Sequence, residues 1–276
     1  MNSIFTLPAM PDVETGDFAR ATAMLHRRAG ILLGQHKRDM AERTLAMRAK
    51  TLRMDKVGTY LAYLEQNPDA PEWQEFINAF TVNHTAFFRE RHHFDVLGRF
   101  AKKRSRPLSV WSAACSTGEE AYSIAMTLRD TLPNPDHQVS ILATDIDTVA
   151  VAAARAGMYT LERIAPVSEQ QRKNYFLRGT GSRAGMVRVK PVLRSMIEFD
   201  VLNLLAPSWP FEQRFDAIFC RNTLIYFDKP TQTRLLGRLA RVMKPGGLLF
   251  VGHSENLTYL TDAFRLKGQT VYEVTH

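Results

Sequence analysis

The stretch LSVWSAACSTGEE, residues 108–120, decides the fold of this 276-residue chain. Its first half, Leu108–Ala113, is a short apolar run typical of a buried strand, and Cys115–Glu120 is a turn of small residues that leads into a helical pattern. Because strands and helices alternate from here on, we predict a doubly wound, mostly parallel sheet. Further strands are predicted at 139–144, 196–199, 215–220 and 248–252, and helices at 119–132, 148–156 and 230–243.

Two segments after residue 108 depart from the alternation of strands and helices. Leu177–Lys190 contains three glycines followed by a β-prone run, which predicts a small antiparallel β-subdomain at about 177–195 inserted into the sheet domain. Residues 264–275 read as two short strands around Gly268-Gln269, which predicts a closing hairpin.

The first part of the chain has a helical texture. Residues 1–17 lack periodicity and are predicted to be a flexible tail, whereas Phe18 to Gln66 carries helical spacing. Asn67–Pro71 is a strong breaker, and Trp73–Phe80 then follows with apolar residues at i, i+3, i+4 and i+7. We therefore expect an α/β protein with a small all-helical domain at 18–80 before the sheet domain at 81–276.

Composition limits the class of protein. Hydrophobic residues make up 45% of the chain, but we find no apolar run near the ~20 residues that span a bilayer. The first ten residues lack the basic and apolar regions of a secretory signal. Because Cys115 and Cys220 cannot form a disulfide framework, we expect a cytoplasmic protein.

The net charge of +8 is concentrated in one segment. Residues 18–56 hold ten Lys/Arg and three Asp/Glu, a net of +7, which leaves +1 for the rest of the chain. On a helical wheel Arg43, Lys50 and Arg53 share one face opposite Leu45. Such a surface predicts an anionic partner, which could be nucleic acid, anionic lipid or an acidic protein face.

Ligands of open α/β sheets bind at the carboxyl ends of the strands, and polar residues gather there in this sequence. The first turn has one glycine and two acids, Glu119 and Glu120, which would repel a pyrophosphate and suit hydroxyls or positive charge. These acids could instead merely complement the helix dipole. Asp145 directly follows the second strand, where an acid commonly binds ribose hydroxyls, whereas Asp147 suits a helix N-cap.

Two more strand ends carry polar groups. Asp200–Leu205 follows the third strand and Cys220–Phe227 follows the fourth. Polar side chains directly after a buried strand are costly unless they find partners or serve a site. An acid after the second strand without a phosphate-binding loop favours S-adenosylmethionine over a dinucleotide.

Seven segments, taken together and in order, resemble the CheR family of chemotaxis-receptor methyltransferases. A single segment such as Ser-Thr-Gly-Glu-Glu is a weak signal, but the ordered set, spread from about residue 18 to 275, is highly specific. The segments are Arg28–Ile31, His36–Met40, Asn83–Glu90, Ser116–Glu120, Asp145–Asp147, Cys220–Phe227 and Gly252–Glu255.

The resemblance implies transfer of a methyl group from S-adenosylmethionine to glutamate side chains of chemoreceptors, with S-adenosylhomocysteine as product, no metal, and a role in chemotactic adaptation. Family catalytic positions correspond here to Arg89, Arg221 and Tyr226. Glu120 fits the family spacing to Asp145 better than Glu119 does. Family cofactor-contacting positions correspond to Asn83, Thr85, Arg89, Glu120, Asp145, Asn203, Leu204, Arg221 and Asn222.

The resemblance also implies partners. The glutamate-bearing cytoplasmic helices of methyl-accepting chemoreceptors would meet the basic face of Arg43, Lys50 and Arg53. The β-subdomain resembles the version that binds a receptor C-terminal peptide at its edge, with Gly185 and Arg188 at the contact. We expect a monomer that binds no nucleic acid and meets the membrane only through receptors.

The chemistry of the implied reaction needs no general base, because a glutamate with a pKa of about 4.3 is already an anion at neutral pH. Positioning and desolvation remain, and an Arg or Tyr can hold one carboxylate oxygen while the other attacks. The sequence leaves open whether Arg89 or Arg221 orients this carboxylate. Arg89 could also be a surface ion pair with Glu90 or Asp95, and Tyr226 a core aromatic.

Two other functions compete with this interpretation. A nucleic-acid methyltransferase would explain the basic segment, but Arg221–Leu224 lacks the Asp/Asn-Pro-Pro-aromatic signature of amino-group methylation. A sensor that binds S-adenosylmethionine without turnover would not need Arg89, Arg221 and Tyr226 together.

Overall fold

The computed structural model describes residues 10–104, 107–135 and 138–275. The chain divides into two compact units, one that ends at Thr81 and one that begins at Val82. The predicted tail lies largely outside the described residues. Within the described part, no helix is both long and apolar enough to cross a membrane.

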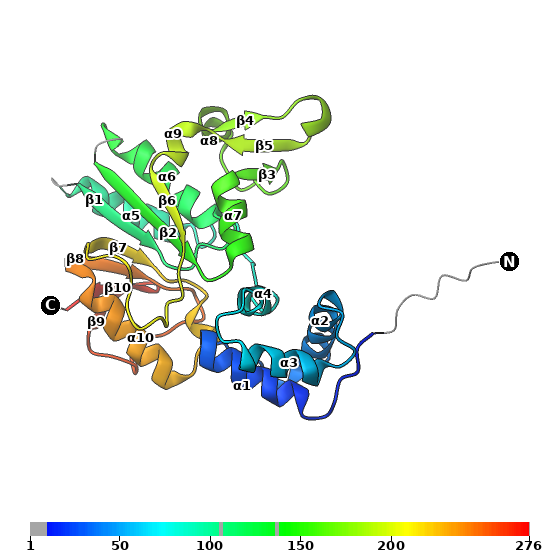
Figure 1. Ribbon diagram of the computed structural model, residues 1–276. Helices are drawn as coiled ribbons and strands as arrows, with labels where there is room; N and C mark the ends of the chain where they lie inside the picture. Colours follow the sequence, from blue (N-terminus) through cyan, green and yellow to red (C-terminus); the bar gives the residue numbers. More distant parts are fainter. Residues whose placement is uncertain (1–9, 105–106, 136–137, 276) are drawn as a thin grey trace. The chain divides into compact units, whose positions relative to one another are not determined.

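The first unit is all-helical (Figure 1). Its helices are α1 (Asp17–Ala29), α2 (Arg38–Thr51), α3 (Val57–Gln66) and α4 (Glu72–Asn78), with the short 3-10 helix η1 (Gln35–Lys37) before α2. The core of this unit consists of buried side chains from all four helices, such as the fully buried Leu25, Leu45, Leu61 and Phe76. Helix α1 ends where Gly30 adopts a left-handed φ of 71°, a conformation that costs glycine little.

The structure corrects the predicted basic helix. Helix α2 ends at Thr51, and Arg53 lies beyond it with a left-handed φ of 57°. Arg53 therefore does not extend the face formed by Arg43 and Lys50. Arg43 and Arg53 are exposed and Lys50 is half-buried.

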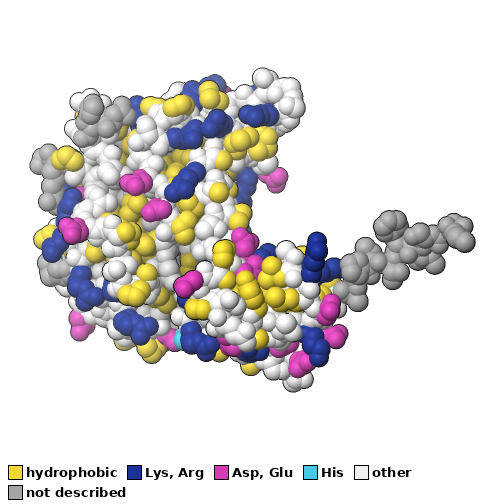
Figure 2. All heavy atoms as spheres, in the orientation of Figure 1, with side chains coloured by type: hydrophobic (Ala, Val, Ile, Leu, Met, Phe, Trp, Pro, Cys, Tyr) yellow, Lys and Arg dark blue, Asp and Glu magenta, His cyan; other side chains and the backbone are white. Residues whose placement is uncertain are grey.

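The location of the net charge is also corrected. Residues 1–81 hold ten Lys/Arg and ten Asp/Glu, so the helical unit is neutral and the whole +8 belongs to residues 82–276. Acids outside the 18–56 window pair with bases inside it, as Glu65 does with Arg20 at 2.6 Å and Glu72 with Arg48 at 2.6 Å. Figure 2 shows basic and acidic side chains interspersed on this unit.

The second unit is built on a sheet that, within the described residues, has seven strands in the order β6-β2-β1-β7-β8-β10-β9. The five strands from β6 to β8 are parallel, and β10 and β9 continue the sheet antiparallel. The strands are β1 (Leu108–Ser112), β2 (Val139–Asp145), β6 (Ile197–Val201), β7 (Phe215–Phe219), β8 (Met243–Phe250), β9 (Phe264–Gly268) and β10 (Val271–Val274).

Side-chain alternation along the strands supplies two buried layers. In β1, Val110 packs with helices α5 and α6 on one face, while its neighbour Trp111 packs with α10 on the other. Figure 1 shows helices on both sides of the sheet, which confirms the predicted doubly wound α/β fold. The helices are α5 (His92–Lys102), α6 (Glu119–Thr131), α7 (Thr148–Ala156), α8 (Glu169–Tyr175), α9 (Pro191–Arg194) and α10 (Lys229–Arg241).

A second, antiparallel sheet of three strands has the order β3-β5-β4 within the described chain. It consists of β3 (Met158–Thr160), β4 (Phe176–Arg178) and β5 (Met186–Val189). The sequence analysis anticipated an antiparallel insertion but missed β3, whose three residues are too few to show a period. Gly179 is required between β4 and β5, because a Cβ there would lie 2.2 Å from the Arg183 carbonyl oxygen.

Candidate active site

The predicted site residues of the second unit gather where β1, β2 and β7 end, next to the segment that precedes α5. Backbone strain marks this place. Of the six described non-glycine residues with positive φ, four belong to these loops: Phe88, Glu90, Ser116 and Asn222. Such conformations persist only when surrounding contacts hold them, and they concentrate at functional sites.

The turn after β1 is fixed by its neighbours. Gly118 has a φ of 97°, and a Cβ there would lie 2.8 Å from the Cβ of Ala154, so only glycine fits. The Ser116 N–H donates to Asp145 Oδ2 at 2.7 Å, and its hydroxyl donates to Asn83 Oδ1 at 2.9 Å. The turn is thereby tied to the end of β2 and to the Asn83 segment.

The two acids at the end of β2 make different contacts, and Asp147 is the helix N-cap that its sequence position predicted. Asp147 caps α7 by accepting from Val149 N at 2.8 Å and Ala150 N at 3.0 Å, and it also accepts from Asn83 Nδ2 at 2.7 Å. Asp145 accepts only backbone N–H groups among its described hydrogen bonds, and burial raises its pKa. Asp145 therefore does not cap a helix, and its two carboxylate oxygens hold the turn after β1 and the start of the next loop.

Glu119 and Glu120 are also separated by the structure. Glu119 accepts from the Thr117 hydroxyl at 2.7 Å and pairs with Arg163 at 2.6 Å. Glu120 instead accepts from the Ser112 hydroxyl at 2.7 Å and from Arg221 Nη1 at 3.2 Å. Burial raises the pKa of Glu120, and the charge of Arg221 opposes this rise. Only Glu120 faces the loop after β7.

Arg221 is the buried centre of the site, with its side chain 2% exposed. Its Nη2 donates to the Arg89 carbonyl oxygen at 2.5 Å, which joins the loop after β7 to the segment before α5. The Arg89 guanidinium donates to the His84 carbonyl oxygen at 2.8 Å. Burial raises the pKa of the half-buried Tyr226, and the nearby charge of Arg89 opposes this rise. The charge of Arg89 thus acts on Tyr226, whereas Arg221 Nη1 contacts Glu120.

The remaining predicted cofactor residues lie around this cluster. Leu202 N donates to the Asp145 carbonyl oxygen at 2.9 Å, which brings Asn203 and Leu204 beside the end of β2. Asn203 Oδ1 accepts from Leu205 N at 2.9 Å and shapes this loop. Thr85 lies, half-buried, in the same segment as Asn83.

Gly185 and Arg188 lie in the small sheet, not in this cluster. Arg43, Lys50 and Arg53 belong to the helical unit. Within the second unit, the structure thus groups the predicted catalytic and cofactor residues and keeps Gly185 and Arg188 apart from them.

Sequence analysis missed Glu255, which organises the loop that carries Arg221. Its buried carboxylate accepts from four backbone N–H groups at 2.6–2.9 Å, on Gly252, Asn222, Thr223 and Leu224. The segment Gly252–Glu255 was part of the family resemblance without a role. The available signal was the position of Glu255 three residues after Gly252, where the predicted strand 248–252 ends.

The two thiols near the site, those of Cys115 and Cys220, are buried. Burial raises the pKa of both thiols, so they are protonated at neutral pH. The described residues hold no group of three or more His, Cys, Asp or Glu side chains arranged to bind a metal ion.

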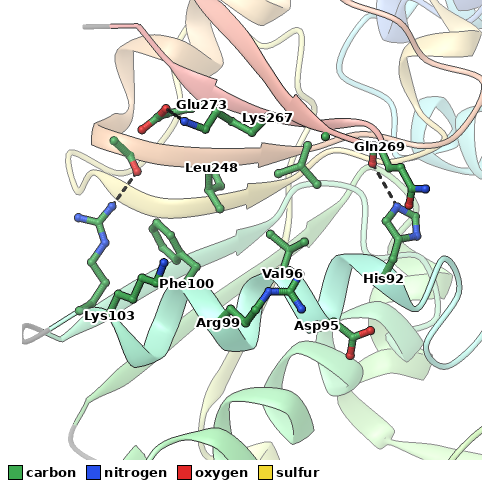
Figure 3. A pocket seen from close by; sticks show the side chains of 14 residues that line it. His92, Asp95, Val96, Arg99, Phe100, Lys103, Leu248, Lys267, Gln269 and Glu273 are labelled. Carbon is green, nitrogen blue, oxygen red and sulfur yellow. Dashed lines mark hydrogen bonds and ion pairs between the residues drawn. The ribbon is translucent and has the colours of Figure 1, made fainter.

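A separate groove of about 730 Å³ lies between α5 and strands β8, β9 and β10 (Figure 3). Hydrogen bonds cross it at both ends, from Arg104 to the Gly246 carbonyl oxygen at 2.7 Å and between His92 and the Gln269 carbonyl oxygen at 3.1 Å. None of the predicted site residues lines it.

Two profiles of known protein families match the chain. The profile of the CheR methyltransferase S-adenosylmethionine-binding domain matches residues 83–273, and that of the CheR all-alpha domain matches residues 16–81. The chain belongs to the CheR methyltransferase family. The two matches correspond to the two units of the structure.

Chemotaxis protein methyltransferases are similar to this CheR-family chain over nearly its whole length. The protein from Klebsiella aerogenes is 50% identical, with 94% of this chain and 89% of that protein covered. The protein from Escherichia coli is 49% identical, with 94% and 90% covered. Chemotaxis protein methyltransferase 2 from Pseudomonas aeruginosa is 48% identical, with 93% and 92% covered.

These findings confirm the expected activity: the chain is an S-adenosylmethionine-dependent methyltransferase of chemotaxis. The residues present fit this cofactor. Its ribose hydroxyls and ammonium group need acceptors, which the carboxylates of Glu120 and Asp145 could supply, and its carboxylate needs a donor, which Arg221 could supply.

Proposed function

We propose that this CheR methyltransferase forms methyl esters on glutamate side chains of chemoreceptors in the cytoplasm. The observation that carries the proposal is the buried Glu120–Arg221 ion pair at 3.2 Å, whose Arg221 also binds the backbone of Arg89 at 2.5 Å and stands in the same loop as Tyr226. A guanidinium and a phenol suit an anionic acceptor, because both donate hydrogen bonds to a carboxylate.

Asp145 and Glu120 would hold the cofactor through its hydroxyl and amino groups. Asn203, Leu204 and Asn222 would line it from the loops after β6 and β7, and Asn83 and Thr85 from the segment before α5. When bound, the cofactor supplies a methyl group on a positively charged sulfur, which is a good leaving group.

Arg89 and Tyr226 would orient the acceptor, while Arg221 shapes the cofactor side. Arg221 is already engaged by a carboxylate and a carbonyl oxygen, whereas the described hydrogen bond of the Arg89 guanidinium goes to the His84 backbone carbonyl. Burial keeps the Tyr226 phenol protonated at neutral pH, so it can donate to one acceptor oxygen while the other attacks. Alignment of this kind can supply roughly 7–11 kcal/mol of the barrier.

Receptor docking would use surfaces outside this cluster. Arg43, Lys50 and Arg53 carry charge suited to glutamate-bearing receptor helices. The small sheet offers β4 as an edge strand. Gly179 N donates to the Met186 carbonyl oxygen and Lys190 N to that of Tyr175, so by alternation the backbone groups of Arg178 point away from β5. A receptor C-terminal peptide could add a strand there, close to Gly185 and Arg188.

The test is incubation with S-adenosylmethionine labelled in its methyl group and with receptor-bearing membranes, followed by mild base. We expect label on the receptors and its release as methanol, because esters hydrolyse in base and N-methyl groups do not. Base-stable label, or label on added DNA or RNA, would contradict the proposal.

A further inference from the structure

Glu90 is a buried acid in the segment that leads into α5. It directly follows Arg89 and stands just before α5, with a left-handed φ of 56°. Its side chain is only 6% exposed. A strained glutamate with a buried carboxylate persists only when its contacts compensate both costs.

The carboxylate of Glu90 joins three segments of the second unit. Its Oε2 lies 3.3 Å from Arg221 Nη2 and 3.5 Å from His93 Nδ1. Its Oε1 accepts from the His253 N–H at 3.4 Å, in the loop after β8. Within the described residues, Oε2 accepts no hydrogen bond of good geometry, so its compensation is the charge of Arg221.

The guanidinium of Arg221 therefore lies between two carboxylates. Nη1 faces Glu120 and Nη2 faces Glu90, while the Arg89 carbonyl oxygen accepts from Nη2. Arg221 Nε has no hydrogen-bond partner among the described residues, so only contacts of Nη1 and Nη2 hold the guanidinium in place. Without Glu90, the guanidinium would keep Glu120 as its single charged neighbour and could rotate toward it.

We propose that Glu90 is a positioning residue, which fixes the Arg221 guanidinium so that Glu120 and Arg221 are both presented to the cofactor. This inference rests on the role proposed for Arg221. Glu90 acts by charge and through Arg221, and it touches neither the cofactor nor the acceptor. A neutral side chain of the same size at position 90 keeps the packing against Arg221 but removes the charge that fixes its guanidinium.

The experiment is a double-mutant cycle on the full chain with Glu90→Gln, Arg221→Lys and the pair. We measure kcat/KM for S-adenosylmethionine in receptor methylation and, separately, the affinity for S-adenosylhomocysteine. Each single variant is expected to lose roughly 10–100-fold in kcat/KM, because small misplacements at a reacting centre cost this much. The double variant is expected to be no worse than the poorer single variant. The matched control Glu198→Gln, on the exposed side of β6, is expected to leave both values unchanged.

Each outcome decides the inference. Additive losses, or full activity of Glu90→Gln while Arg221→Lys is impaired, would overturn the positioning role. Full activity of Arg221→Lys and Arg221→Ala would instead overturn the role proposed for Arg221. If Glu90→Gln does not fold, Glu90→Asp takes its place in the cycle, and additivity with Arg221→Lys again overturns the inference.

Discussion

At the residue scale, neighbouring identical side chains acquire different roles from their direction on a helix. Glu119 and Glu120 are adjacent in the first turn of α6, and a step of about 100° sends one to Arg163 and the other to Arg221. The sequence predicted the N-cap role of Asp147 correctly, because N-cap chemistry is local, whereas the cofactor role of Asp145 stays a prediction. The buried position of Glu90 was not predicted, because an acid next to Arg89 in the sequence suggests a surface ion pair, and only the structure shows its burial.

Substitution of Tyr226 tests the orientation of the acceptor. We expect Tyr226→Phe to lower methyl transfer by roughly 10–100-fold, because one donor to the acceptor is lost. The affinity for S-adenosylhomocysteine, measured by calorimetry, should stay within about 3-fold, since Tyr226 stands on the acceptor side. Unchanged turnover, or equal loss of cofactor affinity, would contradict this role.

His93 makes the stability of the enzyme depend on pH. Burial and the charge of Arg221 lower its pKa to about 3 from 6.5. The unfolded chain therefore binds a proton at His93 more tightly than the folded chain does. The contribution of His93 to the free energy of unfolding is fully present above pH 6.5 and is lost as the pH drops from 6.5 toward 3. The slope is roughly 1.4 kcal/mol per pH unit.

Urea unfolding of wild type and His93→Gln between pH 4 and 7 measures this contribution. The variant is expected to be less stable at pH 7, because a packed ring is lost, but to show a shallower pH slope. Parallel slopes for the two proteins would contradict the assignment of the proton to His93.

At the element scale, local signals were read correctly but sometimes placed in the wrong element. A helix was predicted over 230–243, yet α10 ends at Arg241 and β8 begins at Met243. The register with β7 jumps from the pair Phe215–Met243 to the pair Ala217–Leu248. The Pro-Gly-Gly sequence therefore forms a bulge in a strand, which is where proline is tolerated in sheets.

Charge reversal on α2 tests its role in receptor docking. We expect Arg43→Glu with Lys50→Glu to lower kcat/KM for the receptor by roughly 10-fold, because attraction to receptor glutamates becomes repulsion. Affinity for S-adenosylhomocysteine should be unchanged. Arg241→Glu, an exposed base in the last turn of α10, is the matched control. An equal effect of the control would show that overall charge, not this face, matters.

Removal of one backbone donor tests the edge of the small sheet. Arg178→Pro deletes the outward N–H of β4, so a receptor C-terminal peptide should bind at least about 10-fold more weakly in a fluorescence titration. Arg178→Ala keeps the N–H and is expected to bind more tightly than the proline variant. Equal affinities of the two variants would show that no strand is added at β4.

At the scale of the whole molecule, the structure changes what the net charge means. Over its full extent to Thr81 the helical unit is neutral, because Glu65, Glu72 and other acids balance its bases. The +8 belongs to the catalytic unit. Sequence patterns predicted the doubly wound sheet and its ligand-binding edge, since both follow from element order. They could not predict which charges pair, because Glu72 meets Arg48 only after folding.

The most direct test of the account is mass spectrometry of a chemoreceptor cytoplasmic domain after reaction with this enzyme and S-adenosylmethionine. We predict addition of one methyl group at individual glutamate side chains, lost after mild base and absent with Arg221→Ala. Methylation at lysine, arginine or another atom that withstands base would contradict the central claim.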